Sequence, residues 1–170
     1  MKEREIIVPD SFILKPFYES GDKIDTFLSN NEIHSHFKQD MLTSLGMVFD
    51  YYPWNEPEKS IKIILRQWKD EGEPIISNYF QRRNREKAKP MMIKYISLYI
   101  QAMFWTSSKP VTTLENIGFQ LKELPYSPLN IEERISLIIN VPDQYFTYTA
   151  LNQLYDESIK KWAVFLSKTQ

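Results

Sequence analysis

The chain contains no cysteine among its 170 residues. This absence excludes disulfide bonds, thiolate metal sites and cysteine nucleophiles. Only four glycines are present, and they compose neither a P-loop nor a dinucleotide-binding fingerprint, which disfavours a nucleotide-dependent enzyme. The Gly-x-Ser-x-Gly elbow of serine hydrolases is also absent. We therefore predict no catalytic residue and no bound cofactor.

A hydrophobic run long enough to cross a bilayer is also lacking. The most apolar stretch, residues 90–105, contains Lys94 and Gln101 and is shorter than the ~20 residues that a transmembrane helix needs. Near the N-terminus only residues 6–8 form an apolar run before Pro9, which is too short for the core of a signal peptide. These features predict a soluble, cytoplasmic protein that does not contact a membrane.

No charge of one sign dominates, because 21 basic residues face 22 acidic ones and the formal net charge is −1. This balance argues against a uniformly basic surface for nucleic acid. The charge is nevertheless uneven along the chain, since residues 82–94 hold six basic residues and one acidic residue, a local charge of +5. The basic residues are Arg82, Arg83, Arg85, Lys87, Lys89 and Lys94.

This basic segment is the leading candidate for an anion-binding or partner-binding site. Arginine and lysine side chains are suited to hold phosphates or an acidic surface, and Tyr79 and Tyr95 lie close enough in sequence to add stacking or hydrogen bonds. The alternative is a solvated helix end, where cations near the C-terminus interact favourably with the helix dipole. Both interpretations stay open at this point.

Apolar residues recur at helical spacing along most of the chain. We predict helices over residues 56–71, from Pro74 past Phe80, over 90–105, 112–124 and 131–139, and from Asp143 onward. Gly72 is expected to end the first of them. Capping boxes are expected at Asn55 with Glu58, Thr112 with Glu115 and Asn130 with Glu133. In the N-terminal third we predict a short helix around residues 24–28 and a longer one over 37–49. We predict no sheet.

These elements predict an all-α fold. Six to eight helices joined by short loops favour a single compact helical bundle over residues 22–170. Residues 1–21 contain two prolines among apolar side chains, so we expect them to form an extended N-terminal arm packed on the domain. The apolar stripe of the C-terminal helix suits packing within the chain or against another copy, as in a homo-oligomer.

Histidine and aromatic residues give weaker signals. His34 and His36 are two residues apart, a spacing that points them in different directions on a helix. Because no third ligand is identifiable, we predict no metal site, with an extended His-x-His pair as the alternative. Trp68, Trp105 and Trp162 lie in apolar stripes and are expected in the core. Tyr52 and Trp54 lie in a proline-bounded connection, where we favour packing that locks the loop over an exposed binding surface.

A family resemblance rests on three features of the middle of the chain. They are the Tyr52-Pro53-Trp54 triplet, the apolar stripe from Ile61 to Trp68, and Phe80 followed by Arg82-Arg83. Together they resemble the YpoC-like proteins of Gram-positive bacteria over roughly the middle and C-terminal two-thirds. The resemblance implies a cytoplasmic bacterial helical protein without an established activity, and it supplies no catalytic residues.

Three functions remain after these exclusions. The first is a noncatalytic module that binds a protein partner, suggested by amphipathic helices and abundant aromatic residues without a coherent reaction centre. The second is a nucleic-acid-associated protein that uses the Arg82 to Lys94 patch. The third is an unrecognised enzyme whose acidic residues meet only in the folded chain.

Overall fold

The computed structural model describes residues 4–29 and 31–169. Helix α4 (Arg85–Trp105) lies at its centre, and every residue from Tyr95 to Trp105 is buried. This confirms the helix predicted over residues 90–105, whose apolar residues are spread around most of the helical circumference. Helix α4 nevertheless begins five residues before Pro90, because the side chain of Asn84 accepts a hydrogen bond from the Lys87 amide at 3.2 Å and caps it earlier.

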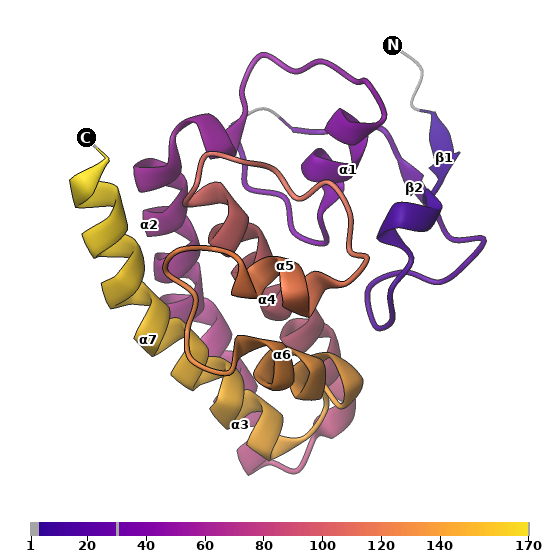
Figure 1. Ribbon diagram of the computed structural model, residues 1–170. Helices are drawn as coiled ribbons and strands as arrows, with labels where there is room; N and C mark the ends of the chain where they lie inside the picture. Colours follow the sequence, from indigo (N-terminus) through magenta and orange to yellow (C-terminus); the bar gives the residue numbers. More distant parts are fainter. Residues whose placement is uncertain (1–3, 30, 170) are drawn as a thin grey trace.

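The other helices pack around α4 (Figure 1). They are α1 (Lys38–Ser44), α2 (Pro57–Gln67), α3 (Glu73–Gln81), α5 (Ile117–Lys122), α6 (Ile131–Asn140) and α7 (Tyr145–Lys168). Short 3-10 turns η1 (Asp10–Phe12) and η2 (Pro53–Asn55) precede α1 and α2. In the view of Figure 1, α2 runs downward into α3, and α7 runs upward along the outer left side. The mostly helical fold is confirmed.

A small sheet corrects the expectation of no strands. Strand β1 (Glu5–Ile7) pairs antiparallel with β2 (Lys23–Asp25), with Ile6 opposite Ile24. The short helix expected around residues 24–28 is therefore wrong, because the backbone of that stretch bonds to a segment nearly twenty residues earlier. Three-residue strands are too short to show an alternating pattern in the sequence.

Two glycines behave differently from their predicted roles. The helix expected over 37–49 covers only α1, because Gly46 adopts a left-handed backbone with φ of +94° and the chain turns away there. Gly72 does not end a helix: α2 continues through the π-helical turn η3 (Trp68–Gly72) directly into α3. A wider turn at this place lets the chain pass the buried rings of Trp68 and Tyr95 without a break.

The predicted helix starts were partly wrong. Helix α2 begins at Pro57 without a side-chain cap, so Asn55 and Glu58 form no capping box. The amide of Glu115 donates to the Thr113 hydroxyl instead of forming a box with Thr112, and α5 begins only at Ile117. Asn130 does precede α6, with a left-handed backbone and no side-chain cap.

The N-terminal part of the chain packs against the helices. Val8, Phe12 and Phe17 of the predicted arm are buried in the core, while residues 1–3 of that arm lie outside the described residues. Trp68, Trp105 and Trp162 are also buried, as predicted. The Trp68 ring stacks on Tyr155 of α7 with centroids 4.6 Å apart. Across the described residues, no helix has the length and apolarity needed to span a membrane.

Candidate functional site

The predicted basic segment lies where α3 turns into α4, at the lower end of the molecule in Figure 1. Arg82 and Arg83 follow the C-terminus of α3, where the helix dipole favours positive charge. Arg85, Lys87 and Lys89 lie instead in the first turns of α4, at the end where the dipole disfavours cations. Helix-dipole stabilisation therefore accounts for only the first two of these five residues.

Two of the six basic residues are occupied by acidic partners. Arg85 Nη2 lies 3.0 Å from Asp143 Oδ2, and its Nε donates to the Asp143 carbonyl, which ties α4 to the turn before α7. Lys94 Nζ lies 3.6 Å from a carboxylate oxygen of Glu71 in η3. No ion pair within residues 4–29 and 31–169 engages the remaining four, which are exposed: Arg82, Arg83, Lys87 and Lys89.

The two tyrosines are not equally accessible. Tyr95 is fully buried beside Trp68, and its hydroxyl donates to the Gln67 carbonyl at 3.2 Å. Burial raises the pKa of that hydroxyl above its ordinary value. Tyr79 is half-buried. The structure thus gathers Arg82 and Arg83 at one turn, places Lys89 in a pocket that Lys15 and Glu19 of the arm also line, and buries the Tyr95 ring so that it cannot stack on a ligand.

The aromatic connection packs inward. Trp54 is only 6% exposed, and its ring centroid lies 6.1 Å from that of Trp105 at the end of α4. Tyr52 packs on Trp54 at 5.2 Å, and its hydroxyl accepts a hydrogen bond from the Phe49 amide. Both side chains hold the loop before α2 against the core.

The two histidines make separate local contacts. His34 Nε2 lies 3.1 Å from the Ser29 carbonyl, and His36 Nδ1 lies 2.9 Å from the Ser35 hydroxyl. Burial, followed by the nearby positive charge of Lys94, lowers the pKa of His36. In the part of the chain that the structure describes, no three metal-ligating side chains gather at one place.

A groove between α2 and α7 is a second candidate site, and it was not predicted from the sequence. It consists of two adjoining pockets of about 600 and 320 Å³ that share Glu58, Lys62 and Leu166. We call it the α2–α7 groove. Its apolar lining comes from Ile61 and Leu65 on α2 and from Ile159, Trp162, Ala163 and Leu166 on α7.

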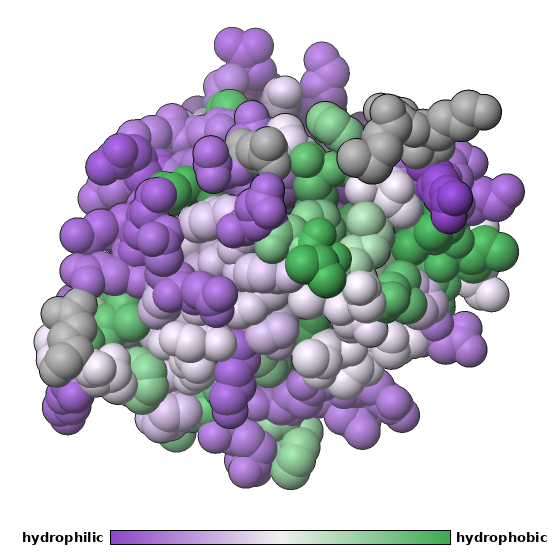
Figure 2. Space-filling model, turned by 90° about the horizontal axis from the view of Figure 1, so that it is seen from above, coloured by the Kyte–Doolittle hydropathy of each residue, from purple (hydrophilic) through white to green (hydrophobic). Residues whose placement is uncertain are grey.

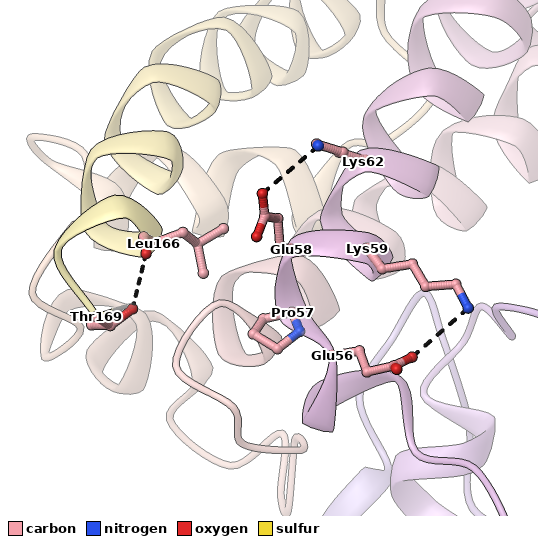
Figure 3. Close-up of a pocket in the computed structure, with 7 residues that line it drawn as sticks. All are labelled: Glu56, Pro57, Glu58, Lys59, Lys62, Leu166 and Thr169. Carbon is pink, nitrogen blue, oxygen red and sulfur yellow. Dashed lines mark hydrogen bonds and ion pairs between the residues drawn. The ribbon is translucent and has the colours of Figure 1, made fainter.

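The groove lies between α2 and α7, which run in opposite directions (Figure 1). Ile61 and Trp162 are buried at its base, whereas Ile159 and Ala163 are exposed along its side. Figure 3 shows Leu166 pointing from α7 toward Pro57 and Glu58 at the start of α2. The helical periodicity correctly identified the apolar rows on both helices, but it cannot show that the two rows leave a groove between them.

Charged residues at the start of α2 and directly before it form the rim of the groove. Glu58 lies 3.7 Å from Lys62, and Glu56 lies 3.8 Å from Lys59, and all four side chains are more than half exposed. Pairs of this kind within one exposed helix contribute only a few tenths of a kcal/mol, roughly 0.3–0.5. The rim is therefore charged but locally neutral, and the interior is apolar.

Exposed hydrophobic side chains also occur on the N-terminal part. Ile7, Phe27, Leu45 and Val48 are each at least half exposed. Figure 2 views the molecule from above, and hydrophobic residues gather on its right half, on the side of the N-terminal strands, while hydrophilic residues cover most of the left half. None of these four side chains lines the α2–α7 groove.

Comparison with known proteins places this architecture in a family. The model of the YpoC-like protein family matches residues 58–170. The chain belongs to the YpoC-like family. The matched region contains α2 to α7, and thus both the basic turn and the α2–α7 groove apart from Glu56 and Pro57 at its rim. The Tyr52-Pro53-Trp54 triplet lies outside it.

One curated relative gives the same result. The uncharacterized protein YpoC of Bacillus subtilis (strain 168) is 28% identical over 108 residues, which cover 64% of this chain and 65% of the relative. The aligned part is thus less than two-thirds of the relative's length. No solved structure matches the chain significantly. These comparisons support a bacterial, mostly helical protein of an uncharacterised family.

Proposed function

We propose that the protein is a noncatalytic interaction module that binds an amphipathic helix of a partner protein in the α2–α7 groove. The observation that carries this proposal is an open apolar groove between two helices of the family region. Grooves of this kind receive the apolar face of a helix whose anchoring residues recur at i, i+3, i+4 and i+7.

The dimensions of the groove suit such a ligand. Lining residues recur at positions 58, 61, 62 and 65 of α2 and at 159, 162, 163 and 166 of α7. From Pro57 to Leu65 the wall extends about 12 Å, at ~1.5 Å per residue, which equals roughly two turns of a bound helix. At the middle of the α7 wall, Ala163 has a short side chain, which leaves room for a larger side chain of the partner.

The chemistry of the groove favours binding over catalysis. A general acid or base works where burial and neighbouring charges perturb its pKa. Here Glu56 and Glu58 lie on the exposed rim and pair with lysines of their own helix, while the interior offers aliphatic and indole groups. The lining thus supplies hydrophobic contact and a polar border, which are the features of a peptide-binding surface.

Affinity enrichment with matched variants tests this proposal. Ala163→Glu places a charge inside the groove, whereas Val164→Glu places the same charge on the neighbouring exposed position of α7, which does not line the groove. From a native lysate, the wild type and the Val164→Glu variant should retain the same specific partner, and the Ala163→Glu variant should lose it. Circular dichroism establishes that both variants keep the helical fold. Enrichment of no specific partner at any salt concentration, or equal retention by both variants, contradicts the proposal.

A second candidate function is binding of nucleic acid at the α3–α4 turn. It is favoured by the four exposed basic residues without an acidic partner in the described chain, Arg82, Arg83, Lys87 and Lys89. If each of these four residues contacts one phosphate of duplex DNA, a plot of the logarithm of the binding constant against the logarithm of the salt concentration has a slope of about −3 to −4.

Electrophoretic or fluorescence titrations at several salt concentrations test this alternative. The triple change of Arg82, Arg83 and Lys87 to alanine should abolish binding. A control that changes Lys69, Lys160 and Lys161 to alanine removes the same charge from exposed positions elsewhere and should bind like the wild type. Absence of wild-type binding at low salt, or equal loss in both triple variants, removes this function.

A further inference from the structure

Helix α4 carries a row of buried polar side chains on one face. Ser97, Gln101 and Trp105 are spaced four residues apart, so that they lie one above another, and each is 0% exposed. Polar groups buried in a core are costly unless they find hydrogen-bond partners. In this chain the partners come from the N-terminal part, from residues 34–40.

The first two members of the row bind backbone groups of that segment. The Ser97 hydroxyl oxygen accepts a hydrogen bond from the His36 amide at 2.9 Å. The Gln101 side chain accepts from the Phe37 amide at 2.8 Å and donates to the His34 carbonyl at 2.9 Å. His36 and Phe37 both adopt a left-handed backbone with φ of +59°, a conformation that costs energy for such side chains and that these bonds hold in place.

The third member binds a side chain, the carboxylate of Asp40. Oδ2 of Asp40 accepts from Trp105 Nε1 at 3.0 Å and from the Val111 amide at 2.7 Å. Asp40 is 1% exposed, and its Oδ1 has no hydrogen-bond partner in the described chain. Both donors are neutral groups, so the negative charge of an ionised Asp40 has no compensating cation.

Charged groups on the surrounding elements are engaged elsewhere. Lys38 on α1 pairs with Asp25 at 2.9 Å, and Lys109 in the loop before Val111 is exposed. On α4, Lys94 pairs with Glu71 and acts on His36 rather than on Asp40. Three other titratable groups with a shifted pKa lie on or against this segment: His36 itself, Tyr18, whose hydroxyl donates to the His36 carbonyl at 2.8 Å, and Asp25, whose pKa is lowered by its bond to Lys38.

We propose that residues 34–40 form a pH-sensitive latch that is held on the α4 row and loosened when Asp40 ionises. Opening would move the carboxylate from an apolar site with two neutral donors into water, and only the charged form gains strongly from that transfer. The latch lies outside the family region, whereas the row to which it binds lies inside it. The released row is then a binding site for a backbone segment, filled here from within the same chain.

The direction of the pH effect follows from the geometry. Burial raises the pKa of Asp40 from the ordinary 3.8 to about 6, and the bonds from Trp105 and Val111 offset only part of that increase. The closed latch therefore binds more protons than the open one between these two values, so its stability falls as pH rises. His36 acts in the opposite direction, because its lowered pKa favours the open form at low pH.

Amide hydrogen exchange of the full-length protein measures the opening directly. Protection factors at residues 36–42, which correct for intrinsic exchange, are compared between the wild type and Asp40→Asn from pH 4 to pH 7.5. The difference between the two proteins removes the contribution of His36. With pKa values of 3.8 and about 6, the Asp40-dependent opening constant should rise roughly tenfold between pH 5 and pH 7 and then level off.

A second variant weakens the latch without removing the titration of Asp40. Ser97→Ala removes one bond of the row and should lower protection at every pH while the tenfold change remains. An unchanged pH dependence in Asp40→Asn overturns the proposal, as does wild-type exchange at residues 36–42 that equals exchange in the core of α4 at every pH. If Asp40→Asn fails to fold, NMR titration of the wild-type Asp40 carboxyl decides the question: an ordinary pKa near 4 contradicts the latch.

Discussion

Gly72 occupies the tightest contact described for any glycine of the chain. A methyl group at this position would lie 2.8 Å from ring carbons of both Trp68 and Tyr95, closer than carbon atoms approach without displacement. Its φ of −61° is ordinary for a helix, so glycine is needed here for space and not for backbone freedom. The residue thus allows a bulky aromatic pair to lie directly against the π-helical turn.

Gly72→Ala is therefore expected to destabilise the protein by up to about 2 kcal/mol, because overpacking a core costs about 1–3 kcal/mol. The cost outweighs the gain of roughly 1 kcal/mol in helix propensity that alanine brings. Urea denaturation measures the change. As a control, Gly118→Ala meets the half-buried side chain of Glu132 at 3.1 Å and its backbone no closer than 3.4 Å, and it should cost less. A Gly72→Ala variant as stable as the wild type would show that the rings move aside freely.

At the scale of single elements, the beginning of α4 shows how one side chain sets a boundary. Asn84 precedes the helix, and its side-chain oxygen accepts from the Lys87 amide. Pro90 looked like the start of the helix because proline suits the first turn, yet it lies inside the helix five residues further on. The basic residues at 85–89 consequently belong to the N-terminus of α4.

Asn84→Ala should cost about 1 kcal/mol, within the range measured for loss of a helix cap. The first turn of α4 loses the partner of one amide, while Arg85 keeps its contacts with Asp143. Thermal unfolding with the exposed Gln81→Ala change as a control is the measurement. Equal melting temperatures for the two variants would mean that water replaces the cap at no cost.

Element type was predictable where a segment is long and strongly periodic. The 3.6-residue pattern found the central helix, the C-terminal helix and the apolar rows on α2. Two predictions from the sequence were wrong. Glycine ordinarily signals the end of a helix, but at Gly72 a π-helical turn continues the chain. Residues 23–25 form a strand because they pair with a distant strand. The predicted capping boxes were also wrong: the residue types were present, but α2 and α6 begin without a side-chain cap, and the Glu115 amide donates to Thr113 instead of Thr112.

At the scale of the whole molecule, the N-terminal part and the family region form one hydrophobic core. Phe12, Phe37, Met41 and Trp54 are buried in the same cluster as α4 and α7. These residues precede the family match, which begins at residue 58. The core therefore depends on a part of the chain that the family comparison does not cover.

A shortened chain that begins at Glu58 tests this dependence. We expect it to bind a hydrophobic dye and to lose cooperative unfolding, because the buried side chains of Ser97 and Gln101 lose their partners and a large apolar surface is exposed. Near-ultraviolet circular dichroism and dye fluorescence provide the readout. Cooperative unfolding at the wild-type midpoint would show that residues 58–170 are independent of the N-terminal part.

The candidate site was only partly predictable from the sequence, because contacts between residues far apart in the chain decide which side chains are accessible. Counting charges along the sequence located the basic segment, although the net charge of the whole chain is close to zero. The sequence did not show that Asp143 and Glu71 pair with two members of this segment, or that Tyr95 is buried. The α2–α7 groove is lined by two helices about a hundred residues apart in the sequence, a juxtaposition that no local pattern records.

The most direct measurement of the proposed function is site-specific photo-crosslinking on α7. A photoreactive amino acid replaces Ala163, inside the α2–α7 groove, or Val164, one position outside it. If a partner helix binds in the groove, one specific partner adduct forms at position 163, excess unmodified protein suppresses it, and no such adduct forms at position 164. Equal adducts at both positions, or an adduct only at position 164, would contradict the proposed function.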